Sequence, residues 1–149
     1  MEQVNIYAYT KINLKKKTGV IGYILEKQTE KGPATLSKLE MVSDMTNNRA
    51  ELTVLIRALS RLNKPCRLAI YTESNYVASA YIMRWIDRWQ KNGWINAKDK
   101  TVANFQEWST LDNYLKKHAF YFCARQEHEY REWLRAEVDR KIKEMDRNV

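Results

Sequence analysis

The stretch Thr46-Asn47-Asn48-Arg49-Ala50-Glu51-Leu52 leads into a helical pattern and places a carboxylate, Glu51, in its opening turn. A second stretch, Ile70-Tyr71-Thr72-Glu73-Ser74-Asn75-Tyr76-Val77, ends a strand-like run with Glu73 at a strand-to-helix turn. Open α/β sheets place their ligands at the carboxyl ends of their strands. Two acids aimed at one point there can hold Mg²⁺ against a phosphate. An acid in a first helical turn also favours the helix dipole, especially if Asn47 or Asn48 is the cap, so Glu51 alone has a structural explanation too.

The bulk composition is that of a globular protein with an excess of positive charge. The 149 residues are 44% hydrophobic and 30% charged, and their formal net charge is +8. A chain of this length can bury a substantial core. Its excess of Lys and Arg favours a polyanionic partner, with nucleic acid as the first candidate.

The same composition argues against a membrane or an oxidising compartment. No apolar run is long enough to span a bilayer, and the N-terminus opens directly into a strand pattern, so we expect no membrane contact and no signal peptide. Cys66 and Cys123 have neither metal-binding nor redox spacing. We therefore expect a cytoplasmic protein with two buried free thiols.

The hydrophobic pattern predicts five strands and four helices. The predicted strands are residues 4–9, 20–26, 34–42, 67–72 and 119–123. The predicted helices begin near residue 52 and end before Pro65, then cover residues 76–89, 105–115 and 130–145, the third capped by Asn104.

Short connections make the first three strands an antiparallel meander, whereas helical crossovers make the last two strands parallel neighbours. We predict an α/β fold in which a mixed five-stranded sheet carries helices on both faces. Without internal repeats or a linker, residues 1–149 are expected to form a single domain.

Both quoted stretches resemble the type I ribonuclease H family, whose patterns there are roughly TNNRxEL and TDSxYV. The resemblance covers nearly the whole chain and is weakest over the first 45 and last 25 residues. It implies the fold just described. It also implies a site in which four carboxylates hold two Mg²⁺ or Mn²⁺ ions that hydrolyse the RNA strand of an RNA–DNA hybrid.

The chain keeps only part of that acid set. Glu51 matches, but the family has Asp in place of Glu73, and the extra methylene should loosen the metal geometry. Tyr9 stands where the family's Asp bridges both metals, and a phenol with a pKa near 10 cannot replace a carboxylate at neutral pH. An ungapped alignment puts Ala136 at the fourth acid position.

Two nearby residues offer partial compensation. Glu137, or its neighbours Glu132 and Asp139, would face the site after a small register shift, although such acids are usually the solvated face of a charged helix. His128 is offset by two residues from a family His that assists product release or proton transfer. A surface His in a loop usually has no such role.

Other residues match the family's binding features. Trp85–Trp94 resembles the family's WIxxWxxxGW segment, a protrusion that holds the DNA strand, and this implies a binding role for Trp89, Lys91 and Trp94 while Trp85 belongs to the core. Asn47, Asn48 and Asn75 match positions that reach the hybrid's minor groove, where a protein can read the RNA 2′-hydroxyl.

Three hypotheses follow. The leading one is a nucleic-acid-binding domain that recognises RNA–DNA hybrid or a related duplex, with weak or no nuclease activity and no cofactor. The second is an active ribonuclease that uses Mg²⁺ or Mn²⁺ and recruits an acid such as Glu137. The third is a protein-interaction module. The sequence leaves the oligomeric state open.

Overall fold

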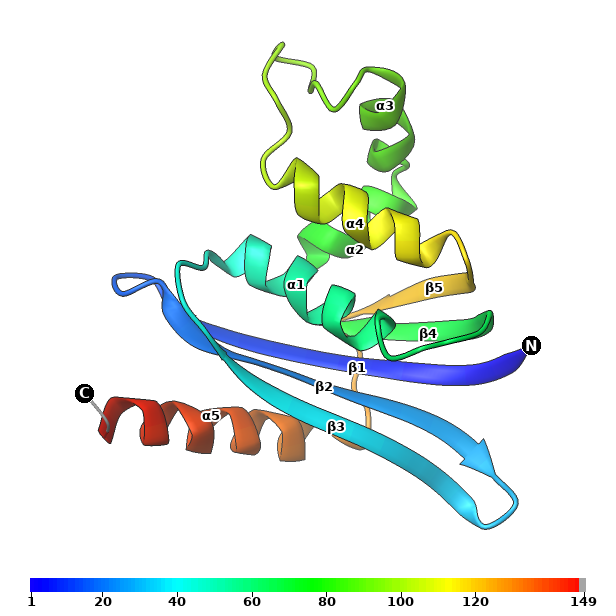
Figure 1. The fold of residues 1–149 in the computed structure, drawn as a ribbon, viewed down its shortest axis with the longest axis vertical. Helices are drawn as coiled ribbons and strands as arrows, with labels where there is room; N and C mark the ends of the chain where they lie inside the picture. The colour runs from blue at the N-terminus through cyan, green and yellow to red at the C-terminus, as the bar shows by residue number, and fades with distance from the viewer. Residues whose placement is uncertain (148–149) are drawn as a thin grey trace.

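A five-stranded sheet forms the centre of the structure, a computed structural model that describes residues 1–147 of the 149 (Figure 1). The strands are β1 (Glu2–Asn13), β2 (Thr18–Thr29), β3 (Gly32–Val42), β4 (Cys66–Thr72) and β5 (Ala119–Ala124). Their order is β3-β2-β1-β4-β5. The first three pair antiparallel, whereas β4 runs parallel to β1 and β5 runs parallel to β4. The predicted mixed sheet is confirmed.

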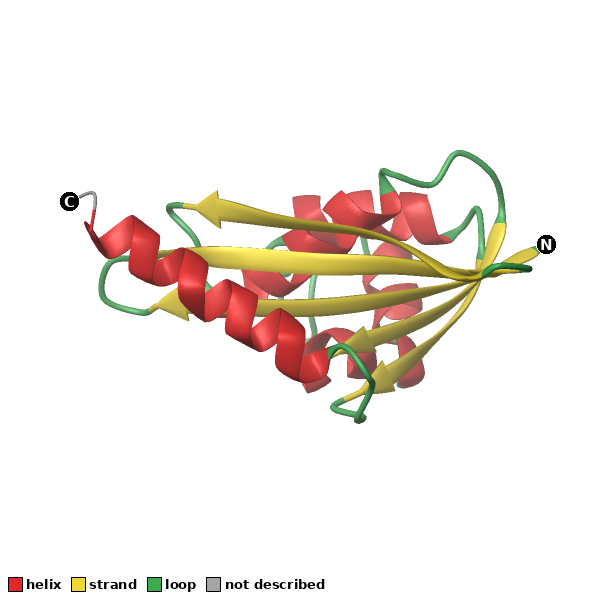
Figure 2. Cartoon of the chain, turned by 90° about the horizontal axis from the view of Figure 1, so that it is seen from below, coloured by secondary structure: helices red, strands yellow, loops and turns green. Residues whose placement is uncertain are grey.

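Helices cover both faces of this sheet, as predicted. They are α1 (Asn47–Leu59), α2 (Asn75–Ile82), α3 (Trp85–Lys91), α4 (Phe105–Leu115) and α5 (Arg131–Arg147). Helix α5 crosses one face over β1, β2 and β3, and the other helices lie on the opposite side (Figure 2). Helix α3 projects furthest from the sheet (Figure 1).

Alternation along β1 builds two hydrophobic cores. Ile6 and Ala8 are buried in the larger core beneath α1, whereas Tyr7 packs with Ile24 and Leu134 beneath α5. Successive side chains of a strand point to opposite faces, so one strand serves both cores. The end of β1 therefore lies between α1 and α5.

Gly22 on β2 allows α5 to lie close to the sheet. A Cβ atom at this position would lie 2.7 Å from Leu39 Cδ2 and 3.2 Å from side-chain atoms of Leu134 and Val138. Only a residue without a side chain leaves room for this close approach.

The structure corrects three local predictions. The helix predicted over residues 76–89 is two helices, because Arg84 adopts a left-handed conformation with φ 59° between α2 and α3. Thr46, rather than Asn47 or Asn48, caps α1 by accepting a hydrogen bond from the Arg49 amide at 3.3 Å. Asn104 does precede α4, but its side chain makes no capping hydrogen bond.

Strand β3 forms one edge of the sheet and is mostly exposed to solvent. Its exposed residues include Pro33, Leu36 and Lys38. Because no strand within residues 1–147 pairs with its outer side, this edge is open.

Both cysteines, Cys66 and Cys123, are buried and free, as predicted. Within residues 1–147, no helix has both the length and the apolar character needed to cross a membrane.

Candidate functional site

Glu51 is held by hydroxyl groups on two neighbouring strands. Its Oε1 accepts a hydrogen bond from Thr10 on β1 at 2.6 Å, and its Oε2 accepts one from Thr72 on β4 at 3.4 Å. Burial raises the pKa of the Glu51 carboxyl, the two hydroxyls oppose this rise, and the negative charge of Glu73 adds to it. Glu51 therefore takes up a proton more readily than an exposed glutamate.

Glu73 directly follows β4 at the turn into α2. This turn is fixed because Thr72 Oγ1 accepts a hydrogen bond from the Ser74 amide at 3.0 Å, and Ser74 Oγ accepts one from the Val77 amide at 3.1 Å. Glu73 lies close enough to Glu51 for its negative charge to act on the Glu51 carboxyl, and a joint role for the two acids stays a prediction.

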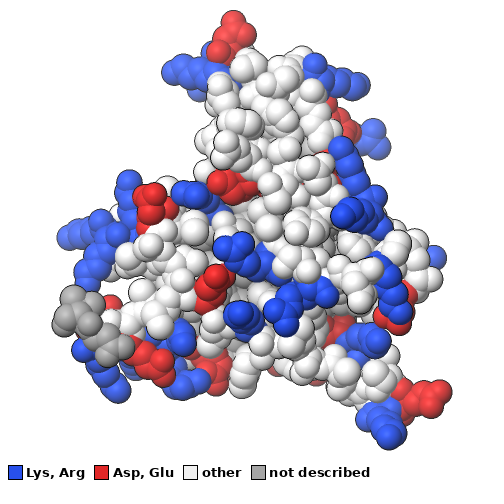
Figure 3. Space-filling view, in the orientation of Figure 1, with Lys and Arg blue, Asp and Glu red and all other residues white. Residues whose placement is uncertain are grey.

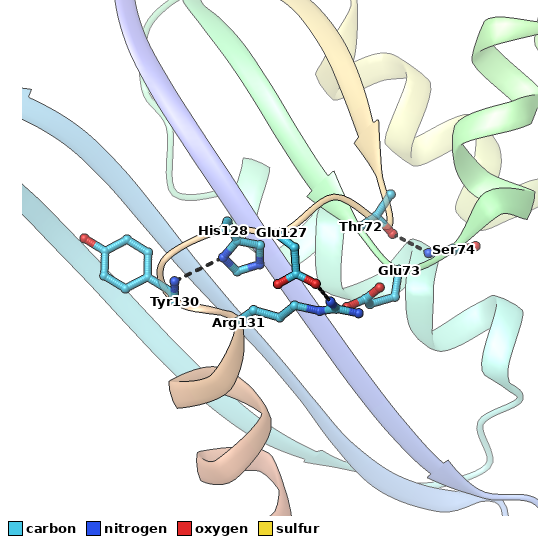
Figure 4. Close-up of polar contacts among 7 residues, drawn as sticks. All are labelled: Thr72, Glu73, Ser74, Glu127, His128, Tyr130 and Arg131. Carbon is cyan, nitrogen blue, oxygen red and sulfur yellow. Dashed lines mark hydrogen bonds and ion pairs between the residues drawn. The ribbon is translucent and has the colours of Figure 1, made fainter.

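The partner of Glu73 is a guanidinium group. Arg131 Nε, at the first residue of α5, donates a hydrogen bond to Glu73 Oε1 at 2.7 Å (Figure 4). Arg131 also donates from Nη1 to Glu127 in the preceding loop. A cation from the protein itself thus neutralises Glu73.

The remaining positions of the predicted acid set supply no carboxylate to this place. The ring of Tyr9 lies 5.8 Å from the Arg135 guanidinium on the α5 face. Ala136 is exposed, and Glu137 forms an ion pair with Arg140 of its own helix. The described part of the chain contains no group of three or more acids, histidines or cysteines placed to hold a metal ion.

This set of donors does not fit a divalent ion. Mg²⁺ binds through oxygen ligands in near-ideal octahedral geometry. Here the oxygens of Glu51 already accept from hydroxyls, and Glu73 carries a guanidinium whose positive charge would repel the ion. We therefore assign no metal-dependent step to this arrangement.

His128 packs on the sheet in the loop before α5. Its ring centroid lies 4.4 Å from that of Tyr7 and 5.3 Å from that of Tyr71. Its Nδ1 accepts a hydrogen bond from the Tyr130 amide at 3.2 Å. Burial lowers the pKa of His128, although the charge of Glu73 opposes this shift. The ring is therefore built into the packing of the loop, and a catalytic role stays a prediction.

A buried glutamate beneath this loop was not found from the sequence. Glu26 is 3% exposed and accepts hydrogen bonds from the Tyr130 hydroxyl at 2.5 Å, the Tyr7 hydroxyl at 2.8 Å and Asn5 Nδ2 at 3.1 Å. We call these four residues the Glu26 cluster. The sequence does not show this cluster, because it depends on the β1–β2 register that places Asn5 opposite Glu26.

The predicted binding tryptophans form the aromatic base of the projecting α3 region. Trp89 packs on Trp108, with ring centroids 5.5 Å apart, and on Trp94 at 6.5 Å. Gln90 fastens α3 to α4 by donating to the buried Asp112 at 2.5 Å. Lys91 is exposed.

A hollow of about 460 Å³ on this region exposes part of the tryptophan surface. Trp85, Trp89, Arg88 and Lys98 are among its lining residues. Arg88 and Lys98 were not singled out from the sequence, although both lie in the basic, aromatic segment around α3. Their positive charges beside aromatic rings suit phosphate and sugar contacts.

The three asparagines lie at helix starts. Asn47 and Asn48 begin α1, Asn75 begins α2, and all three are exposed. On the face seen in Figure 3, Lys and Arg form several groups with Asp and Glu between them. The positive charge is therefore distributed over this face rather than confined to one patch.

Comparison with known proteins relates this arrangement to one family. The family model described as RNase H matches residues 1–132. Among curated proteins, the Ribonuclease H of Clostridium botulinum is 40% identical over 90 residues, which are 60% of each chain. The Ribonuclease H of Brucella anthropi is 46% identical over 76 residues, 51% of this chain and 49% of the relative. The matched segments thus span only about half to three fifths of these relatives.

Solved structures show the same fold. LC9-RNase H1, described as a type 1 RNase H with the type 2 active-site motif, has a TM-score of 0.72 at 20% identity, covering 91% of this chain and 70% of its own. The foamy viral protease-reverse transcriptase in complex with RNA/DNA hybrid has a TM-score of 0.62 at 15% identity, covering 84% of this chain and 17% of its own.

Proposed function

Because the chain belongs to the ribonuclease H family, we propose that it binds RNA–DNA hybrid or a related duplex and hydrolyses it weakly or not at all. The observation that supports this most strongly is the bond from Arg131 to Glu73, which puts a protein cation on one of the two retained acids. The absence of a β1 carboxylate at Tyr9 supports it further.

Weak catalysis follows from the chemistry of two-metal hydrolysis. That reaction needs a metal cation beside the attacking oxygen and another beside the leaving oxygen. Loss of the bridging acid should remove several kcal/mol of transition-state stabilisation, on the order of 10³-fold or more in rate. A further rate loss is expected because Arg131 competes with any ion for Glu73.

The proposed binding depends on groups other than the acids of the candidate metal site. Asn48 and Asn75 are exposed at the starts of α1 and α2, next to the candidate site, where amide groups can contact a minor groove. The hollow beside α3 combines tryptophan surface with basic side chains. Both features suit a duplex better than a small ligand.

A gel-shift series tests the binding. We expect the protein to bind hybrid at low salt, with affinity that falls steeply as salt rises, because neutralised phosphates release counterions. Trp89→Ala and Lys91→Glu should each weaken binding by about 1 kcal/mol or more. Asn48→Ala should instead reduce the preference for hybrid over DNA duplex.

Trp133→Ala is the matched control, because Trp133 is an exposed tryptophan on α5 outside the hollow. No hybrid binding at low salt, or binding unaffected by both the Trp89 and the Lys91 change, would contradict the proposal and favour a protein-interaction module. Rapid cleavage of labelled hybrid in Mg²⁺ or Mn²⁺, absent in EDTA, would instead show an active ribonuclease.

A further inference from the structure

We propose, on the basis of the nucleic-acid binding proposed above, that Arg131 binds a backbone phosphate where a two-metal enzyme would hold it with metal ions. Arg131 is the first residue of α5 and lies against Glu73, the acid that directly follows β4. Its side chain is 24% exposed, so the guanidinium is held in the site and still reaches solvent.

The guanidinium has donors left for a ligand. Arginine carries five N–H groups in a planar fork. The Nε group donates to Glu73, which fixes the plane of the fork, and Nη1 donates to Glu127. A phosphate binds the outer edge of such a fork through two parallel hydrogen bonds.

Glu127 occupies the place that such a phosphate would take. Its side chain is 84% exposed, and exposed ion pairs contribute little stability. An incoming phosphate can therefore displace Glu127 while Arg131 stays on Glu73. Glu127 is in this sense an internal anion that covers Arg131 until a nucleic acid binds.

The loop before α5 presents Arg131 in a fixed position. The adjacent Tyr130 is bonded to the buried Glu26, and its amide donates to His128, which stacks on Tyr7. A cation held in its binding geometry loses little conformational entropy when the ligand arrives. The Glu26 cluster thus positions Arg131 without touching the phosphate.

Hybrid-binding assays in EDTA test the proposal. Arg131→Ala should weaken binding by about tenfold or more, as for loss of a hydrogen bond to a charged group. It should also lower the slope of log affinity against log salt by about one. Glu127→Gln should strengthen binding several-fold, because the phosphate no longer displaces a carboxylate.

Arg140→Ala is the matched control, since Arg140 lies on the same helix and pairs with Glu137 and Glu144. Arg140→Ala should change the hybrid affinity and the salt slope only as much as the loss of any one surface charge does. The Glu127→Gln result keeps the test valid even if Arg131→Ala unfolds. Unchanged affinity in Glu127→Gln, or an Arg131→Ala slope equal to that of the unmodified protein, overturns the proposal.

These results also separate the two proposals. If Lys91→Glu weakens binding whereas Arg131→Ala does not, the binding function stands and the assignment of Arg131 fails. If the unmodified protein does not bind hybrid in EDTA at low salt, the assignment of Arg131 fails. If Mg²⁺ then restores binding, the proposed binding function still stands. If Mg²⁺ does not restore binding, the proposed binding function fails as well.

Discussion

At the scale of single residues, the half-buried Glu51 and the buried Glu26 respond to their surroundings in opposite ways. Burial raises the pKa of Glu51, and two threonine hydroxyls only partly oppose the rise. Burial also acts to raise the pKa of Glu26, but hydrogen bonds from Tyr130, Tyr7 and Asn5 outweigh it, so the pKa of Glu26 is lowered. Glu26 accepts three hydrogen bonds, whereas Glu51 accepts two, one of them long at 3.4 Å.

Glu51→Gln should therefore stabilise the protein at pH 7. A carboxyl whose pKa is raised in the folded state binds more protons there than in the unfolded chain. Stability therefore falls as the pH rises from the pKa of the unfolded state through the pKa of the folded state. We expect the free energy of unfolding to rise by about 1 kcal/mol at pH 7, with the gain disappearing below pH ~4. Urea unfolding at both pH values measures this.

Glu132→Gln is the control for Glu51→Gln, because Glu132 is an exposed acid of α5. If the two substitutions have equal effects at pH 7, the burial of Glu51 does not determine its energetics.

The positions of the site acids followed from the sequence, whereas their partners did not. A carboxylate after a strand and another in a helix start are local features, so Glu51 and Glu73 could be placed together. Arg131 lies 58 residues beyond Glu73. Its approach depends on the conformation of the loop before α5, which no local pattern specifies.

At the scale of elements, the Glu26 cluster joins that loop to β1 and β2. Tyr130→Phe removes one donor to Glu26 and should lower the free energy of unfolding by about 1 kcal/mol at pH 7. A carboxyl with a lowered pKa contributes stability above its unfolded value and loses it as pH falls. The difference between the variant and the unmodified protein should therefore shrink in acid.

Urea unfolding at pH 7 and in acid tests this, with Tyr121→Phe as control because Tyr121 is an exposed tyrosine on β5. A Tyr130→Phe effect that is constant with pH would mean that the hydroxyl does not act through Glu26.

Most elements were predictable because their hydrophobic period is clear. The bounds of α4, Phe105–Leu115, agree with the predicted helix. The break between α2 and α3 was missed because it contains neither Gly nor Pro, and Arg84 adopts its left-handed conformation without a sequence signal. Trp89 of α3 packs on Trp108, a tertiary contact that local propensity does not specify.

At the scale of the whole molecule, the chain has the ribonuclease H fold, whereas Glu73 beside α2 is paired with Arg131. We expect Mg²⁺ to leave the thermal unfolding temperature of the unmodified protein unchanged, because the donors do not fit the ion. The three substitutions Tyr9→Asp, Glu73→Asp and Ala136→Asp introduce acids at the family positions. While Arg131 remains, we expect that Mg²⁺ still does not raise the unfolding temperature of this triple variant. Adding Arg131→Ala to these three should produce a Mg²⁺-dependent rise in unfolding temperature.

Calorimetric melts of the triple and quadruple variants with Mg²⁺ or EDTA decide this. A Mg²⁺-dependent rise in the triple variant would show that Arg131 does not obstruct the ion.

The open edge at β3 has a consequence for the behaviour of this protein in crowded solution. Unpaired backbone groups along a strand are a template on which a second copy can add its own strand and begin an aggregate. Pro33 lacks an amide hydrogen, and Lys38 adds charge to the same edge. We therefore expect solubility at high concentration to depend on these two residues of the edge strand β3, which two other strands separate from β4.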